Sequence, residues 1–180
     1  MKFSDLYKLS DVKLDFGCGL NCEKGFIGVD REAFNDNVRL TFDMDGNKIP
    51  LKDNCVDEIA CNHTLEHLRY PMESVIEFYR VLKPYGVLTI HVPYFAHHAS
   101  SVPVHTNYWS MQAKILLDGS YHESAAKFKS VVITHKWGES GFYWPIEKIF
   151  DAIIDWKPAF YEKRLAHFFP FLELQFRCTK

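Results

Sequence analysis

Glycine and aspartate residues stand where the first two predicted strands end, an arrangement that can bind a polar ligand. The segment Asp15-Phe16-Gly17-Cys18-Gly19 follows a short apolar run, and its glycines let the backbone approach a ligand closely. Asp30 ends the next apolar run. A carboxylate accepts two charge-assisted hydrogen bonds, which suits a vicinal diol. These residues therefore predict a site for a ligand with ribose hydroxyls.

The same residues argue against a dinucleotide. The dinucleotide fingerprint has a third glycine three residues after the second and an acidic residue about 20 residues further on. Here Cys22 occupies the place of the third glycine, and Asp30 comes too early. An NAD-dependent oxidoreductase therefore remains a minor alternative.

Histidine is the side chain best suited to general-base chemistry near neutral pH. His63 follows the fourth predicted strand, and His97, His98 and His105 fall in the irregular, aromatic-rich residues 93–109. We treat these four histidines as candidate bases without choosing among them. An aromatic patch of the core is the alternative interpretation of residues 93–109.

The cysteines give no sign of a metal site. The chain has five of them, an odd number that favours free thiols in a reducing compartment. Neither Cys18 with Cys22 nor Cys61 with His63 has a second pair at zinc-finger spacing. We predict no metal ligands, and we expect Cys18 to be a small packing residue.

The elements that must position these residues are short strands and amphipathic helices. Proline near the start and apolar residues at helical spacing predict a helix over 71–82, and a second amphipathic pattern covers 145–156. Ser110 can cap a short helix that ends at Leu117. Strands are predicted at residues 12–16, 25–29, 38–42, 56–61, 86–92 and 129–135.

Two further predictions concern the fifth strand and the tail. Residues 83–86 have proline and glycine at the places that a type I turn favours, and the nearly continuous apolar run of residues 86–92 predicts a central strand covered on both faces. Residues 172–179 alternate strictly, so we expect a half-exposed strand at the edge of the sheet. The order of elements predicts an open α/β sheet with helices on both faces.

Composition and charge limit the choice of function. The chain has 180 residues, of which 47% are hydrophobic, so it is expected to form a single domain over 1–180. A formal net charge of −2 argues against a nucleic-acid partner. Acidic Asp5 and the lack of a long apolar run argue against a secretory signal and a membrane span, which predicts a cytoplasmic protein.

Several segments taken together resemble the class I S-adenosylmethionine-dependent methyltransferases, in particular their type 11 small-molecule branch. The resemblance spans residues 12–93. The segments that carry it are Leu14-Asp15-Phe16-Gly17-Cys18-Gly19, Ile27-Gly28-Val29-Asp30, Asp43-Met44-Asp45, residues 49–59, residues 62–68 and residues 79–86.

The resemblance implies S-adenosylmethionine as the cofactor and a Rossmann-like, mostly parallel sheet with a C-terminal antiparallel strand. It implies that residues 12–93 bind the cofactor and that residues 94–180 supply acceptor loops and the final strands. The residues implied for the methionine half are Gly17, Cys18, Gly19, Asn62 and His63, and Asp15 is implied as a further cofactor-binding residue. Asp30 is implied for the ribose, and Asp43, Met44 and Asp45 for the adenine.

The chain also departs from that family. Too few residues separate Gly19 from the second strand for the usual crossover helix, so we expect a shortened first crossover. The residues after the fourth strand, Asn62-His63-Thr64-Leu65, differ from the proline-rich signature of enzymes that methylate base amines. The function expected is methyl transfer to a small-molecule acceptor. The alternative is a non-catalytic module that serves as a partner subunit.

Overall fold

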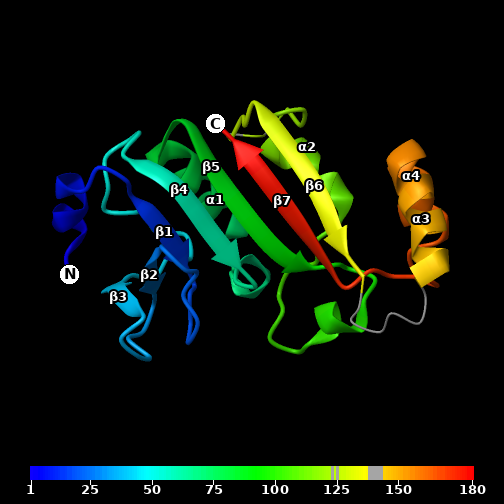
Figure 1. Ribbon diagram of the computed structural model, residues 1–180, viewed down its shortest axis with the longest axis horizontal. Coiled ribbons are helices and arrows are strands. Elements are labelled where there is room, and N and C mark those ends of the chain that lie inside the picture. Colours follow the sequence, from blue (N-terminus) through cyan, green and yellow to red (C-terminus); the bar gives the residue numbers. More distant parts are fainter. Residues whose placement is uncertain (123, 125, 138–143) are drawn as a thin grey trace.

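The protein is built on one seven-stranded sheet in the order β3-β2-β1-β4-β5-β7-β6 (Figure 1). The computed structural model describes residues 1–122, 124, 126–137 and 144–180. β7 runs antiparallel to both of its neighbours, whereas the other strand pairs run parallel. The strands are β1 (Lys13–Phe16), β2 (Ile27–Asp30), β3 (Val38–Thr41), β4 (Val56–Asn62), β5 (Leu82–Pro93), β6 (Ser130–Lys136) and β7 (Glu173–Thr179). The predicted Rossmann-like sheet is confirmed.

The described residues also form four α-helices and four short 3-10 helices. The helices are α1 (Pro71–Val81), α2 (Lys114–Leu117), α3 (Trp144–Trp156) and α4 (Pro158–Arg164), with η1 (Phe3–Lys8), η2 (Leu65–His67), η3 (His98–Ser101) and η4 (Met111–Ala113). The hydroxyl of Ser110 accepts a hydrogen bond from the Gln112 amide, which confirms the predicted cap before α2. α4 was not predicted.

The predicted turn at residues 83–86 lies inside a strand. β5 begins at Leu82, directly after α1, and the pairing with β4 shifts register between Val56 and Glu58. Tyr85 has a positive φ of 66° within this shift, and its amide donates to the Lys180 carbonyl. Pro84 and Gly86 therefore lie in a bulge of β5, and the hydrogen bond from Tyr85 to Lys180 ties this bulge to the C-terminal residue.

The C-terminal strand is interior, so the predicted edge position is wrong. β7 pairs with β5 from Val87↔Thr179 to Pro93↔Glu173, and with β6 on its other side. Its alternation is nevertheless real, because Leu174, Phe176 and Cys178 are fully buried while the intervening side chains are partly or fully exposed. Alternation reports one covered face and carries no information about pairing at the strand edges.

One face of the sheet is covered and the other is largely open. α1 packs on the face of Phe16, whose ring centroid lies 4.9 Å from that of Phe78, and the α1 residue Tyr79 contacts Phe128 after α2. On β5 the buried Leu88, Ile90 and Val92 alternate with partly exposed residues.

Figure 1 looks onto the open face, with α1 and α2 behind the strands. The helices of the described residues thus lie on one face of the sheet or beside its β6 edge, and not on both faces as predicted. β5 is therefore covered by helices on one face only.

The open face follows from short connections. Residues 17–26 join β1 to β2 and residues 31–37 join β2 to β3, without a helix in either segment. Parallel strands are normally joined by a dozen or more residues that form a helix over the sheet. The shortened first crossover is confirmed. The connection from β2 to β3 is short as well.

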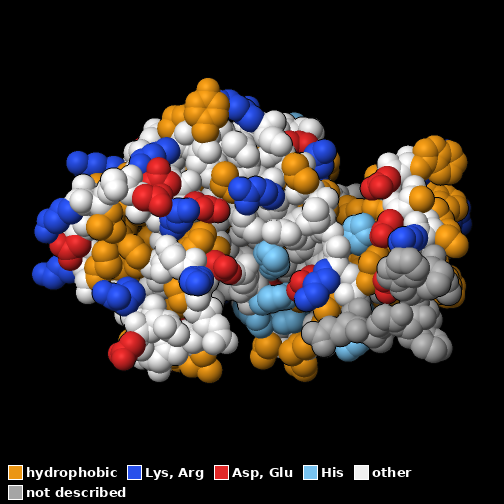
Figure 2. Space-filling model, in the orientation of Figure 1, with side chains coloured by type: hydrophobic (Ala, Val, Ile, Leu, Met, Phe, Trp, Pro, Cys, Tyr) orange, Lys and Arg blue, Asp and Glu red, His pale blue; other side chains and the backbone are white. Residues whose placement is uncertain are grey.

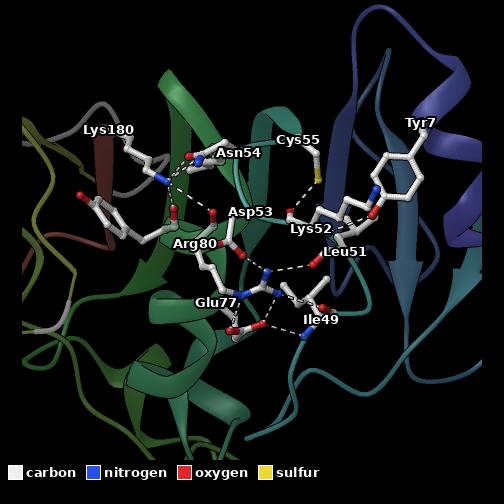
Figure 3. Close-up of polar contacts among 12 residues, drawn as sticks. Tyr7, Ile49, Leu51, Lys52, Asp53, Asn54, Cys55, Glu77, Arg80 and Lys180 are labelled. Atoms are coloured by element: carbon white, nitrogen blue, oxygen red, sulfur yellow. Dashed lines mark hydrogen bonds and ion pairs between the residues drawn. The ribbon is translucent and has the colours of Figure 1, made fainter.

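A hydrogen-bonded network holds the longer connection between β3 and β4 on the covered face (Figure 3). The Arg80 guanidinium donates to the carbonyls of Ile49 and Leu51 and to the carboxylates of Asp53 and Glu77, at 2.7–2.9 Å. Glu77 in turn accepts from the Ile49 amide at 2.8 Å. One helix residue therefore fixes residues 49–53 against α1.

No helix in the described parts of the chain is long and apolar enough to cross a membrane.

Candidate functional site at the carboxyl edge of the parallel strands

The residues predicted to bind the cofactor lie at one edge of the sheet. β1, β2, β3 and β4 run parallel, so their carboxyl ends meet there. Asp15 precedes the glycine turn of β1, Asp30 ends β2, Asp43 follows β3, and Asn62 ends β4. Ligands of open α/β sheets bind in this position.

The glycine turn has a backbone that other residues would not adopt easily. Gly17 and Gly19 have φ values of 73° and 52°. A Cβ on Gly17 would lie 2.2 Å from the Thr64 hydroxyl, whereas a Cβ on Gly19 would meet no atom within 4 Å. Gly17 is therefore required by packing against the loop after β4, and Gly19 leaves space above the turn.

Asp30 ties the glycine turn to the end of β2. One carboxylate oxygen accepts from the Gly19 amide at 2.8 Å, and the other accepts from the Arg31 amide at 2.7 Å. Each carboxylate oxygen has two lone pairs, so one acceptor position per oxygen is left. Asp30 can therefore hold the turn and accept further hydrogen bonds from a ligand.

Asp15 lies beneath the same turn and is only 1% exposed. Its Oδ2 accepts from the Glu23 amide at 2.7 Å, whereas Oδ1 is buried without a hydrogen-bond partner among the described residues. Burial raises the pKa of this carboxyl to about 6. An unpaired buried carboxylate oxygen is costly, which makes it a candidate ligand contact.

The three residues predicted near the adenine have different surroundings. Met44 is buried, and its carbonyl accepts from the Ser74 hydroxyl. The Asp45 carboxylate accepts from the Arg69 and Tyr70 amides at 3.0 and 2.8 Å, just before α1. Asp43 is exposed, and one of its oxygens accepts from the Asp45 amide. Asp45 is thus engaged in the loop before α1, which leaves Asp43 as the accessible carboxylate.

Cys18 is buried between the glycine turn and β2. Its sulfur lies 2.7 Å from the place where Gly28 would carry a Cβ. Burial raises the pKa of the thiol to about 12, so the reactive thiolate is disfavoured. This environment agrees with the predicted packing role.

Asn62 and His63 end β4 beside β5. The His63 amide donates to the His91 carbonyl at 2.9 Å, and the residue has a positive φ of 47°. Its Nε2 lies 3.0 Å from an oxygen of Glu173, and its Nδ1 lies 3.5 Å from Oε1 of Glu66. The Glu66 carboxylate is the main cause of a raised pKa of His63.

A cavity of about 310 Å³ opens beside His63. Figure 2 shows histidine side chains gathered near the lower middle of the open face. The cavity is lined by His63, Glu66, His67, Pro93, Ala99, His105, Leu172 and Glu173. It thus joins the end of β4 to the loop after β5 and to the start of β7.

The four candidate bases separate into two pairs. His63 and His105 line the cavity, and neither His97 nor His98 contributes to its lining. Nδ1 of His97 instead accepts from the Ala99 amide at 3.1 Å, as the cap of η3. Burial and the neighbouring His98 lower the pKa of His97.

Two residues that line the cavity, Glu66 and Glu173, were not predicted as site residues from the sequence. Both carboxylate oxygens of Glu66 are buried without a hydrogen-bond partner among the described residues. Glu173 comes from the C-terminal strand, and the interior position of that strand brings it to His63. The only sequence signal for Glu173 was the alternating pattern of residues 172–179, which predicted a strand with polar residues on one face.

Comparison with known proteins gives one family match and several similar folds. Residues 15–90 match the family model described as "Methyltransferase domain". No curated protein matches the sequence. A SAM-dependent methyltransferase from Archaeoglobus fulgidus is 18% identical with a TM-score of 0.62, over 99% of this chain and 90% of that one.

Two further solved structures have a similar fold. Phosphoethanolamine N-methyltransferase 2 of Haemonchus contortus, in complex with S-adenosyl-L-methionine, is 15% identical with a TM-score of 0.57, over 98% of this chain and 51% of that one. A chain in the complex of the Haloferax volcanii Trm112 methyltransferase activator with a methyltransferase is 15% identical with a TM-score of 0.58, over 98% of this chain and 87% of that one.

At these identities the structural likeness establishes the fold, and the family match covers most of the residues predicted to bind the cofactor. Both agree with the prediction of S-adenosylmethionine as the cofactor. Residues 15–90 thus match the methyltransferase domain family, in a chain that has the fold of the class I S-adenosylmethionine-dependent methyltransferases.

Proposed function

We propose that this chain binds S-adenosylmethionine at the carboxyl edge of β1–β4 and transfers its methyl group to a small-molecule acceptor in the cavity beside His63. The observation that carries the proposal is the convergence of the glycine turn, Asp30 and Asn62 at one edge, within the segment that matches the methyltransferase domain. The cavity next to this edge supplies a place for the acceptor.

The described residues fit the cofactor by chemical type. The unpaired Oδ1 of Asp15 can accept from a ligand ammonium group. The open space above Gly19 admits a ligand next to the backbone. Asp30 keeps lone pairs for the ribose diol, and the exposed Asp43 is the candidate partner of the adenine amine.

The bound cofactor supplies an electrophilic methyl group. Methyl transfer is an in-line displacement, so the protein must mainly hold the acceptor near the methyl group, aligned and away from water. We propose that His63 takes the proton from an acceptor hydroxyl or ammonium, because it lies between Asn62 and the cavity. His105 is the other candidate base that lines the cavity.

Two properties favour a small acceptor. The net charge of −2 offers no general attraction for a nucleic acid. The cavity of about 310 Å³ is at the small end of ligand pockets. We further propose that the chain acts as one domain, in which residues 12–93 bind the cofactor and residues 94–180 contribute acceptor loops and the final strands.

Calorimetry tests the cofactor part of this function. We expect S-adenosylmethionine and S-adenosylhomocysteine to bind to the full chain, and NADH not to bind. Methyl transfer from labelled cofactor to a panel of small hydroxyl and amine compounds tests the reaction itself. Absence of binding at millimolar cofactor contradicts the proposal.

Asp30→Ala provides a sharper test. Losing hydrogen bonds to a charged group costs about 1–3 kcal/mol, so S-adenosylhomocysteine should bind roughly 5- to 150-fold more weakly. Asp30→Asn retains one acceptor oxygen and should lose less affinity. Circular dichroism must show that both variants fold, because Asp30 also holds the Gly19 amide. Unchanged affinity of Asp30→Ala would remove Asp30 from the site.

A second candidate function is a cofactor-fold module that acts as a partner subunit. The open sheet face favours it, because parallel sheets are usually covered on both sides. One neighbour in the comparison comes from a complex of a methyltransferase with its activator. Cofactor binding without turnover, together with a stable complex in a pull-down, would favour this function over catalysis.

A further inference from the structure

Three side chains from two separate segments of the chain converge at the cavity. One carboxylate oxygen of Glu66 and one ring nitrogen each of His67 and His105 lie within 4.8 Å of one another. The rings of His67 and His105 pack edge to face, with centroids 4.7 Å apart. Two imidazoles and one carboxylate form the ligand type of several catalytic metal centres.

Glu66 supplies an independent reason to expect a cation. The residue is 1% exposed, and neither of its carboxylate oxygens has a hydrogen-bond partner among the described residues. Nδ1 of His63 is 3.5 Å from Oε1, which is too long for a well-formed hydrogen bond. This long ion pair leaves both oxygens without a hydrogen bond among the described residues, and a buried carboxylate in that state is better stabilised by a closer cation.

The two histidines are also oriented as metal ligands usually are. Nδ1 of His67 lies 3.3 Å from the Val104 carbonyl oxygen, and Nδ1 of His105 lies 3.2 Å from the Ser100 carbonyl oxygen. A carbonyl only accepts, so each Nδ1 must carry the hydrogen, which leaves the Nε2 lone pair free. Ligating histidines almost always donate their other N–H to such a partner.

We propose that Glu66, His67 and His105 bind one divalent transition-metal ion, with Zn²⁺ as the best chemical match. Ligand atoms of a tetrahedral Zn²⁺ site lie about 3.3 Å apart, given bonds of about 2.0–2.1 Å. The three candidate ligand atoms lie within 4.8 Å of one another, and the exposed His67 ring leaves room for the small movement that bonds of this length could require.

The proposed metal has open coordination positions on the cavity side. Three protein ligands with an open position are characteristic of catalytic zinc sites, in which the metal polarises a bound oxygen. An acceptor oxygen bound there would lie beside His63. This consequence rests on the proposed function, whereas binding of the metal itself does not.

Metal binding is measured on the full chain after treatment with a chelator, without cofactor or acceptor. Calorimetry with Zn²⁺ should show one ion per chain, and Co²⁺ should give the visible absorption of a low-symmetry site. Glu66→Gln and His105→Ala should each bind Zn²⁺ at least about tenfold more weakly, because even loss of an outer-shell partner costs 10–100-fold. Mg²⁺, which prefers oxygen ligands, should not compete.

The matched control is His98→Ala, a histidine of the same loop that lies outside the cluster and should bind Zn²⁺ like the parent. Near-ultraviolet circular dichroism verifies folding. If Glu66→Gln does not fold, His105→Ala decides the result, because its side chain comes from a loop. The proposal is overturned if the parent binds neither Zn²⁺ nor Co²⁺, if Glu66→Gln and His105→Ala bind like the parent, or if His98→Ala loses binding equally. S-adenosylhomocysteine calorimetry on the same samples tests the proposed function separately.

Discussion

At the residue scale, the unusual feature is the set of buried carboxylates at the functional edge of the sheet. Asp15 and Glu66 are each 1% exposed, and each has a carboxylate oxygen without a hydrogen-bond partner among the described residues. Asp30 is better satisfied, since two backbone amides donate to it. Buried unsatisfied groups destabilise a fold, and their concentration at one edge indicates that this edge is shaped for ligands.

Asp15 should make stability depend on pH. Its pKa is about 6 in the folded protein against 3.8 in the unfolded chain, so the native state binds the proton more tightly. The free energy of unfolding should therefore fall as pH rises from about 4 to about 6, by up to about 3 kcal/mol from this group. Asp15→Asn removes the titration, and its amide oxygen can still accept from Glu23.

Urea unfolding of the parent and Asp15→Asn at pH 4 and pH 7 checks this sign. The stability of the variant relative to the parent should be greater at pH 7 than at pH 4. A difference that does not change with pH contradicts the buried, destabilised carboxylate.

The two glycines of the turn allow a matched comparison. Gly17→Ala places a methyl group against Thr64 and forces alanine into a positive φ, so we expect a loss of about 2–5 kcal/mol in unfolding free energy. Gly19→Ala meets no atom within 4 Å and should lose only about 1–2 kcal/mol. Denaturant unfolding of both variants measures the difference. Equal losses would contradict the contact with Thr64.

At the scale of elements, loops join the first four strands, which helices usually join in parallel sheets. The connection from β3 to β4 has no helix, and the Arg80 network holds part of it against α1 (Figure 3). This loop carries Asp43 and Met44 near its start. The Arg80 contacts therefore stabilise the same connection that supplies the proposed adenine contacts.

Arg80→Lys should destabilise the protein by about 1–3 kcal/mol. One ammonium cannot replace the five hydrogen bonds that the guanidinium makes to Glu77, Asp53 and two carbonyls, and buried acceptors are left unpaired. Thermal unfolding gives the measurement. The matched control is Arg177→Lys on exposed β7 surface, which should change stability by less than about 0.5 kcal/mol. Equal effects would contradict a specific role for Arg80.

At the scale of the whole molecule, the sheet has one buried face and one open face. Along β5, Leu88 is fully buried, whereas Thr89 on the opposite face is partly exposed. The two connections that could have covered the open face are too short to form helices. The free energy of unfolding should therefore depend mainly on side chains of the buried face.

A pair of neighbouring substitutions tests this asymmetry. Leu88→Ala should cost about 2–5 kcal/mol, since it leaves a cavity in the core. Thr89→Phe should change the free energy of unfolding by less than about 1 kcal/mol, because the added ring extends into solvent. Denaturant unfolding compares the two. A loss above about 2 kcal/mol for Thr89→Phe would show that this face is covered.

Much of the first half could be predicted because its signals are local. Short apolar runs ending on glycine or aspartate marked β1 to β3, a run followed by Asn62-His63 marked β4, and apolar residues at helical spacing marked α1, with each boundary within about two residues. The order of these segments also carried the family resemblance. α4 was missed, and the proline and glycine at residues 83–86 indicated a turn where the chain forms a bulged strand.

The sequence by itself determined the parallel sheet, the place of Asp15, Asp30 and Asn62 at strand ends, and the shortened crossover, because each depends on the type and spacing of nearby residues. Only the tertiary structure decided that β7 lies inside the sheet and that one face is open, since strand pairing and face covering depend on distant segments. The same reason applies to the cluster of Glu66, His67 and His105. His105 joins Glu66 and His67 only when the loop after β5 folds back over the end of β4.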